Sequence, residues 1–164
     1  MLGTIFKKPV EDWNEYAKTA EWANKNNAQI IEYEDCYRVQ SIPDPTFEEL
    51  KSIKLTELES SYDARVSGSF ICSLCWAMQF DRSDTLAVEG AIQLLRANGQ
   101  SLGYLTDAND ETHYDLPLAT MEAVKVEMLS AYAQCHARKQ ELRAAINAAQ
   151  NEEELNAIEI TWPV

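Results

Sequence analysis

Apolar residues near the start of the chain recur first at helical spacing and then at strand spacing. Between residues 11 and 24 they fall mostly three or four positions apart, which predicts an amphipathic helix. Residues 28–33 and 36–40 are rich in β-branched and aromatic side chains and flank a short acidic segment, as in a β-hairpin. With residues 4–7 as a weak first strand, the chain should begin with a small strand-helix-hairpin lobe.

Two prolines mark the end of this lobe. Pro43 and Pro45 lack backbone donors and restrict the residues before them, so regular structure should stop here. We therefore predict a lobe at residues 1–42, a proline-rich linker at 43–47 and a helix-rich domain at 48–164.

The larger domain should open with a helix that runs to about Ala64. Thr46 is followed three residues later by Glu49, the spacing of a capping box that satisfies free amides at a helix start. The positions expected to face inward on this helix are Leu50, Ile53, Leu58 and Tyr62.

Strand and helix patterns then alternate. Residues 69–72 and 76–80 predict a first hairpin, and residues 85–95 predict a helix that stops at an Asn-Gly pair. Residues 103–106 and 112–115 predict a second hairpin, joined by a polar turn.

A long amphipathic pattern follows Pro117 and continues to about Ala149. At about 1.5 Å per residue such a helix is longer than a domain of this size needs, so its end should project or pack on another chain. Asn151 and Glu154 have the spacing of a capping pair and should open a short last helix. The predicted fold class is α+β: the small lobe, then a helix-rich lobe with two β-hairpins and one long C-terminal helix.

The chain is strongly acidic. It carries 14 Lys and Arg residues against 27 Asp and Glu residues, a formal net charge of −13. This excess repels phosphates and anionic lipids, so we expect neither nucleic acid nor a membrane as a partner. No apolar run has the length of a membrane span or of a signal peptide, which predicts a cytoplasmic protein unless it leaves as part of an assembly.

One local motif has the spacing of a metal or redox site. Cys72 and Cys75 are separated by two residues, and a thiolate pair of this spacing can bind zinc or form a disulfide. Zinc would need two further ligands, and Cys135 and His136 are adjacent on a helix and point about 100° apart. The other candidates are Cys36 and His113. We therefore expect reduced structural cysteines, no cofactor and no metal, with Cys72 and Cys75 as weak metal candidates.

No complete catalytic site is recognisable in the sequence. His113 and His136 are the two histidines, and neither has the signature of a nucleophile-base pair. The acidic segment 107–111 lacks the glycine and the closing glutamate of a helix-loop-helix calcium site, so we interpret it as a solvated turn. Glycine-rich phosphate loops are absent as well. The protein is predicted not to be an enzyme.

The aromatic residues indicate an interaction protein. Four tryptophans are spread over both lobes, and although core packing is their commoner use, an exposed one would mark an interface. The candidate partner-binding residues are Trp22, Trp76, Tyr132, His136 and Trp162.

The order of turns and helix ends from Leu55 to Ile158 resembles an uncharacterised domain of bacteriophage tail-fibre and tail-associated proteins. The segments that carry the resemblance are residues 62–65, 78–82, 104–109, 117–118 and 153–158. The front part also looks like the start of small phage tail-region proteins, on residues 14–16, 23–24, 30–32 and 43–46. The chain departs from the pattern at Cys72 and Cys75, where a glycine-containing turn is more usual, and at Ala119, where a threonine cap is more usual.

The resemblance implies a non-enzymatic structural or assembly protein of a phage tail, such as a tail-fibre accessory, connector or chaperone. Its partners would be tail or tail-fibre proteins, or a second copy of itself, and it would reside in the virion tail or in the host cytoplasm during assembly. One alternative is a small acidic phage-encoded inhibitor of a bacterial defence protein, which the charge fits. Another is a zinc-dependent or redox enzyme that uses Cys72 and Cys75.

Overall fold

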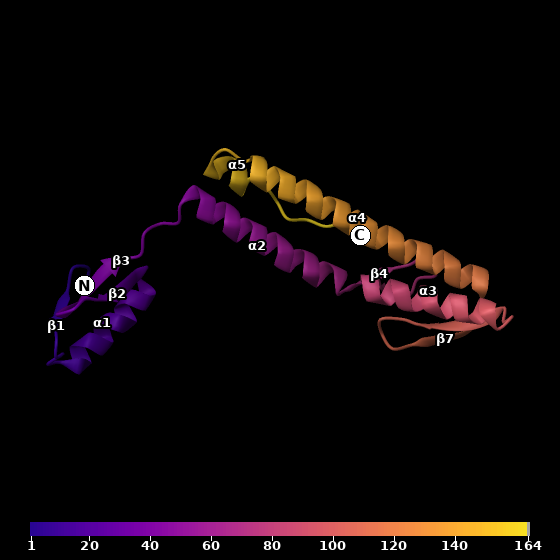
Figure 1. Cartoon of the computed structure of the whole chain (residues 1–164), viewed down its shortest axis with the longest axis horizontal. Helices are drawn as coiled ribbons and strands as arrows, with labels where there is room; N and C mark the ends of the chain where they lie inside the picture. The colour runs from indigo at the N-terminus through magenta and orange to yellow at the C-terminus, as the bar shows by residue number, and fades with distance from the viewer. Residues whose placement is uncertain (164) are drawn as a thin grey trace. The chain divides into compact units, whose positions relative to one another are not determined.

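A computed structural model describes residues 1–163, which fall into two compact units, Met1–Thr46 and a larger unit from Phe47 onward. About 52% of the chain is helix and 19% is strand, in several small antiparallel sheets. The predicted α+β class is therefore confirmed. Figure 1 shows the elements of both units.

The first unit is a three-stranded antiparallel sheet with one helix. Its elements are β1 (Ile5–Lys7), α1 (Trp13–Lys25), β2 (Ala28–Glu32) and β3 (Cys36–Ser41), and the strand order is β1-β3-β2. Asp12 caps α1, because its carboxylate accepts hydrogen bonds from the backbone N–H groups of Asn14 and Glu15. The buried core of this unit contains Phe6, Val10, Ala23, Ala28 and Val39.

The second unit is organised by one long helix. Its elements are α2 (Phe47–Val66), β4 (Ser69–Ile71), β5 (Ala77–Gln79), α3 (Arg82–Ala97), β6 (Leu102–Thr106), β7 (Thr112–Pro117), α4 (Leu118–Ala148) and α5 (Glu152–Asn156). The strands form two hairpins, β4-β5 and β6-β7. In Figure 1, α4 lies beside α3 over its first part and beside α2 over its second part.

Two buried clusters follow the two parts of α4. Around its first part, Met121, Val124 and Met128 pack with Phe80, Ile92 and other residues of the hairpins and α3. Around its second part, Leu142 and Ile146 pack with Leu58 of α2 and Leu155 of α5. The apolar stripe predicted for this helix is therefore buried along its whole length by the chain's own elements.

Two expectations about the helices are wrong. The far end of α4 does not project, since α2 and α5 cover Leu142 and Ile146, and the alternative that it packs on another chain stays a prediction. Ile53 does not face inward, because 58% of it is exposed. At about 100° per residue Ile53 lies roughly 140° around α2 from Leu58, which is fully buried.

None of the helices within the described part of the chain is both long and apolar enough to span a bilayer.

Candidate functional site

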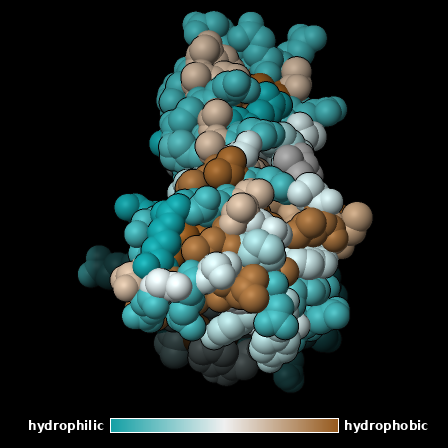
Figure 2. Space-filling model, turned by 90° about the vertical axis from the view of Figure 1, so that its right-hand side faces the viewer, coloured by the Kyte–Doolittle hydropathy of each residue, from teal (hydrophilic) through white to brown (hydrophobic). Residues whose placement is uncertain are grey.

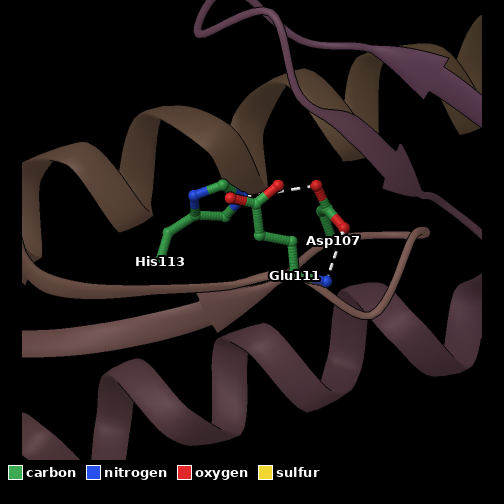
Figure 3. Close-up of side chains that lie close together, drawn as sticks. All are labelled: Asp107, Glu111 and His113. Carbon is green, nitrogen blue, oxygen red and sulfur yellow. Dashed lines mark hydrogen bonds and ion pairs between the residues drawn. The ribbon is translucent and has the colours of Figure 1, made fainter.

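The β6-β7 hairpin brings together three side chains that can bind a metal. Asp107 directly follows β6, Glu111 directly precedes β7, and His113 lies within β7. One ligand atom from each residue lies within 4.8 Å of the others. Figure 3 shows the three side chains converging above the turn. Within residues 1–163 this is the one group of three or more such residues with that geometry.

The turn is built around the Asp107 carboxylate. Its Oδ1 accepts hydrogen bonds from the backbone N–H groups of Asn109, at 2.8 Å, and Glu111, at 3.0 Å. The backbone N–H of Asp107 donates to the Glu111 carbonyl at 2.9 Å, and Asp110 closes the turn with a φ of 62°. Asp107 is only 7% exposed. The turn is thus where the sequence predicts it, but the prediction that it is solvated is wrong for Asp107.

The second oxygen of Asp107 faces the histidine. Oδ2 lies 3.3 Å from Nε2 of His113. Burial acts to raise the pKa of the Asp107 carboxyl, but the N–H groups of Asn109 and Glu111, together with His113, outweigh it and hold this pKa below its usual value. At neutral pH the site therefore contains a buried, ionised carboxylate beside an imidazole.

An aromatic side chain from the other hairpin fixes the imidazole plane. The rings of Trp76 and His113 are stacked, with centroids 3.7 Å apart and planes inclined by 9°. The backbone N–H of Ala108 also donates to the Ala77 carbonyl at 2.7 Å. Trp76, one of the predicted partner-binding residues, is half-buried and forms one wall of this site.

The cysteine pair has no further metal-ligand candidate beside it within residues 1–163. Cys72 is buried, whereas Cys75 is exposed and has a φ of 63°, and both are free thiols. The backbone N–H of Cys75 donates to the Cys72 carbonyl at 2.9 Å, which closes the tip of the β4-β5 hairpin. Across the described residues no group of metal-binding geometry includes either cysteine.

Three other predicted partner-binding residues gather around Tyr62. Its ring centroid lies 6.3 Å from that of His136 and 5.7 Å from that of Trp162. Tyr132 stacks on His136 at 6.3 Å, and Trp162 donates from Nε1 to Oγ of Ser61 at 2.9 Å. Tyr132 and Trp162 are half-buried, while His136 is exposed. Most of this aromatic surface is therefore used within the chain.

The tryptophans of the first unit differ in exposure. Trp22, the predicted partner-binding residue, is half-buried against the core of the unit. Trp13 is 63% exposed and has an edge-on contact with Tyr16 at 5.5 Å. Trp13 is the first residue of α1, and its helical spacing in the sequence did not distinguish it from the buried residues of that helix.

Exposed aliphatic side chains lie on both α3 and α4. Leu86 is 61% exposed, Val126 59% and Leu129 47%; we call these three residues the α3/α4 patch. Leu86 and Leu129 share a pocket of about 280 Å³, to which Tyr132 also contributes. Figure 2 views the end of the second unit where α3 ends and α4 begins, and there too hydrophobic side chains lie in patches among hydrophilic ones. Helical periodicity in the sequence did not identify these residues, because it predicts which apolar side chains are buried and not which ones are exposed.

Comparison with known proteins gives a family for the second unit. Residues 49–160 match the model of a family described as Domain of unknown function (DUF4376). No match was found among curated proteins or among solved structures. The matched segment extends from the first turns of α2 past the end of α5 and covers well over half of the chain. The chain therefore belongs to the DUF4376 family.

Proposed function

We propose that the protein is a non-enzymatic structural or assembly protein of a bacteriophage tail, which acts by binding another tail or tail-fibre protein. The resemblance of residues 55–158 to a domain of tail-fibre and tail-associated proteins supports the phage setting. The α3/α4 patch is the observation that carries the binding role. In this proposal the protein resides in the virion tail, or in the host cytoplasm during assembly.

The physical argument concerns water around the patch. Leu86, Val126 and Leu129 leave about half or more of their surfaces in contact with solvent. Single exposed apolar residues are common, but here two of them line one pocket and the third lies one helical turn from Leu129. Removing such a surface from water favours association. Besides the two leucines, Arg82, Thr85 and Tyr132 line this pocket, so a charged side chain lies beside the apolar ones.

Photo-crosslinking in infected cells tests this proposal. A benzophenone amino acid is placed at Leu86 or at Leu129, and crosslinked products from cells and purified virions are identified by mass spectrometry. The matched control carries the same amino acid at Ile53, which is similarly exposed but lies on α2. We expect positions 86 and 129 to crosslink to a tail protein, and position 53 to do so much less.

Three results would contradict the proposal. One is a virion and a set of tail intermediates that both lack the protein, with normal tail assembly after deletion of its gene. Another is crosslinking from positions 86 and 129 only to a second copy of the chain. The third is a complex with a basic host protein that dissociates as salt is raised, because the net charge of −13 would then drive binding and the inhibitor alternative would hold.

A further inference from the structure

The turn between β6 and β7 contains a buried carboxylate oxygen that the hydrogen bonds of the turn do not use. Asp107 Oδ1 alone accepts the two backbone N–H groups that shape the turn. The other oxygen, Oδ2, takes no part in these hydrogen bonds, and Asp107 is only 7% exposed. Among the described residues the one partner of Oδ2 is the His113 imidazole. Figure 3 shows the Glu111 carboxylate beside this pair.

We propose that Asp107, Glu111 and His113 bind a divalent transition-metal ion. Zinc bonds of about 2.0–2.2 Å to nitrogen and carboxylate oxygen place two ligand atoms of one tetrahedral ion about 3.4 Å apart. The three ligand atoms here already lie within 4.8 Å of one another. The distance of 3.3 Å between Oδ2 of Asp107 and Nε2 of His113 already fits one ion, and the exposed Glu111 side chain would rotate to supply the third ligand.

The donor set selects the class of ion. One imidazole nitrogen and two carboxylate oxygens suit zinc, cobalt and manganese, whereas calcium and magnesium prefer oxygen donors alone. Three protein ligands leave a fourth position of a tetrahedral ion for water or for a side chain of a partner.

Two of the three ligands, Asp107 and His113, are held in place before any ion arrives. The Asp107 side chain is 4% exposed and that of His113 is 15% exposed. The stack with Trp76 fixes the plane of the imidazole, and the backbone hydrogen bond from Ala108 to Ala77 holds the turn on the β4-β5 hairpin. The backbone N–H groups of Asn109 and Glu111 also bind Oδ1 of Asp107, and outer hydrogen bonds of this kind orient metal ligands and raise affinity. A bound ion would connect the two strands of the β6-β7 hairpin and, through Trp76, stabilise its contact with the β4-β5 hairpin.

Isothermal titration with zinc chloride tests the site on the full chain. Because cysteines also bind zinc, the titration uses a Cys75→Ser background, which removes the exposed thiol. We expect one equivalent of zinc to bind. Glu111→Gln and His113→Gln should each weaken binding by about tenfold or more. The matched control is Asp110→Asn, which changes a carboxylate of the same turn that lies outside the three-residue group and should bind as the background does.

Cobalt provides a second readout that reports the ligands directly. Cobalt bound through one imidazole and carboxylates should give a weak visible absorption without the strong near-ultraviolet band of thiolate ligands. That spectrum should be lost in His113→Gln. The proposal is overturned if zinc does not bind, if Glu111→Gln and His113→Gln bind as well as the background, or if Asp110→Asn weakens binding equally. Circular dichroism of each variant establishes that the fold is retained.

Discussion

The imidazole of His113 lies nearly flat against the indole of Trp76, with 3.7 Å between the ring centroids. His113 belongs to β7, whereas Trp76 directly precedes β5, so the stack joins two hairpins that pair no strands with each other. A backbone hydrogen bond from Ala108 to Ala77 joins the same two hairpins. The position of the metal-binding candidates therefore depends on both hairpins.

A double-mutant cycle on Trp76→Leu and His113→Gln should show that the two rings stabilise each other. We expect a coupling of about 0.5–1.5 kcal/mol in the free energy of unfolding, the usual value for paired rings. Urea unfolding followed by circular dichroism measures it. The control cycle uses Tyr104 and Tyr114, whose exposed rings lie 6.0 Å apart at an angle of 40° and should couple more weakly. Equal coupling in the two cycles would contradict a specific role for the stack.

The sequence predicts the strands and the turn of this site, but it does not predict that the two hairpins contact each other. Alternating β-formers around a polar segment are enough to predict β6, β7 and the turn between them. The burial of Asp107 cannot be predicted in that way, because it depends on contacts with the β4-β5 hairpin, which is distant in the sequence. The stack of Trp76 on His113 depends on the same contact between hairpins, so sequence periodicity does not predict it. A partner-binding role of Trp76 stays a prediction.

The error at Ile53 has a similar physical origin. An apolar residue at approximately helical spacing was assigned to the inward face of α2, but the packing partners of a helix decide which side is inward. Here α4 and α5 contact the side with Leu58, and Ile53 lies on the other side. The length of α4 was predicted correctly, yet the elements that cover its far end could not be predicted from periodicity alone.

Alanine substitutions on the two sides of α2 should differ in their effect on stability. Leu58→Ala should lower the free energy of unfolding by about 2–5 kcal/mol, because it leaves a cavity beside Leu142 and Ile146. Ile53→Ala should change it by no more than about 0.5 kcal/mol, since its side chain is 58% exposed. Urea unfolding curves of both variants measure the difference. Comparable losses in the two variants would show that Ile53 is covered in solution, for example by a partner.

The start of α3 should give two opposite pH effects. The Asp81 carboxylate accepts hydrogen bonds from the Asp84 N–H and the Ser83 hydroxyl, which hold the pKa of Asp81 below its usual value of 3.8. The folded state therefore binds this proton less readily than the unfolded state. Its contribution to stability is present above about pH 4 and is lost as the pH falls below that value. Asp81→Asn keeps an oxygen that can cap the helix, so it should remove this pH-dependent contribution with little loss of stability. Asp81→Ala should lower the free energy of unfolding by about 1 kcal/mol.

Asp84 supplies the control with the opposite sign. Burial, and then the charge of Asp81, raise the pKa of the Asp84 carboxyl above its usual value of 3.8. The folded state binds this proton more tightly, so the contribution of Asp84 to stability is present at low pH and is lost as the pH rises through the folded pKa. Thermal unfolding from pH 3 to pH 7 measures both effects. As the pH rises, the stability of the wild type should fall relative to Asp84→Asn and should rise relative to Asp81→Asn. The same trend against both variants would contradict the assigned hydrogen bonds.

Alanine at two glycines of the second unit should have opposite effects on stability. A Cβ at Gly103 would lie 2.5 Å from Cδ1 of Leu95 and 2.8 Å from Sδ of the fully buried Met121, so both side chains or the backbone of β6 must move. Gly103→Ala should therefore destabilise the protein by about 1–3 kcal/mol.

Gly90 lies within α3, and a Cβ there meets no atom within 4 Å. Gly90→Ala should stabilise the protein by roughly 0.8–1.0 kcal/mol, because alanine favours the helix. Urea unfolding measures both changes. A neutral Gly103→Ala would show that β6 does not approach α3 and α4 as closely as the structure places it.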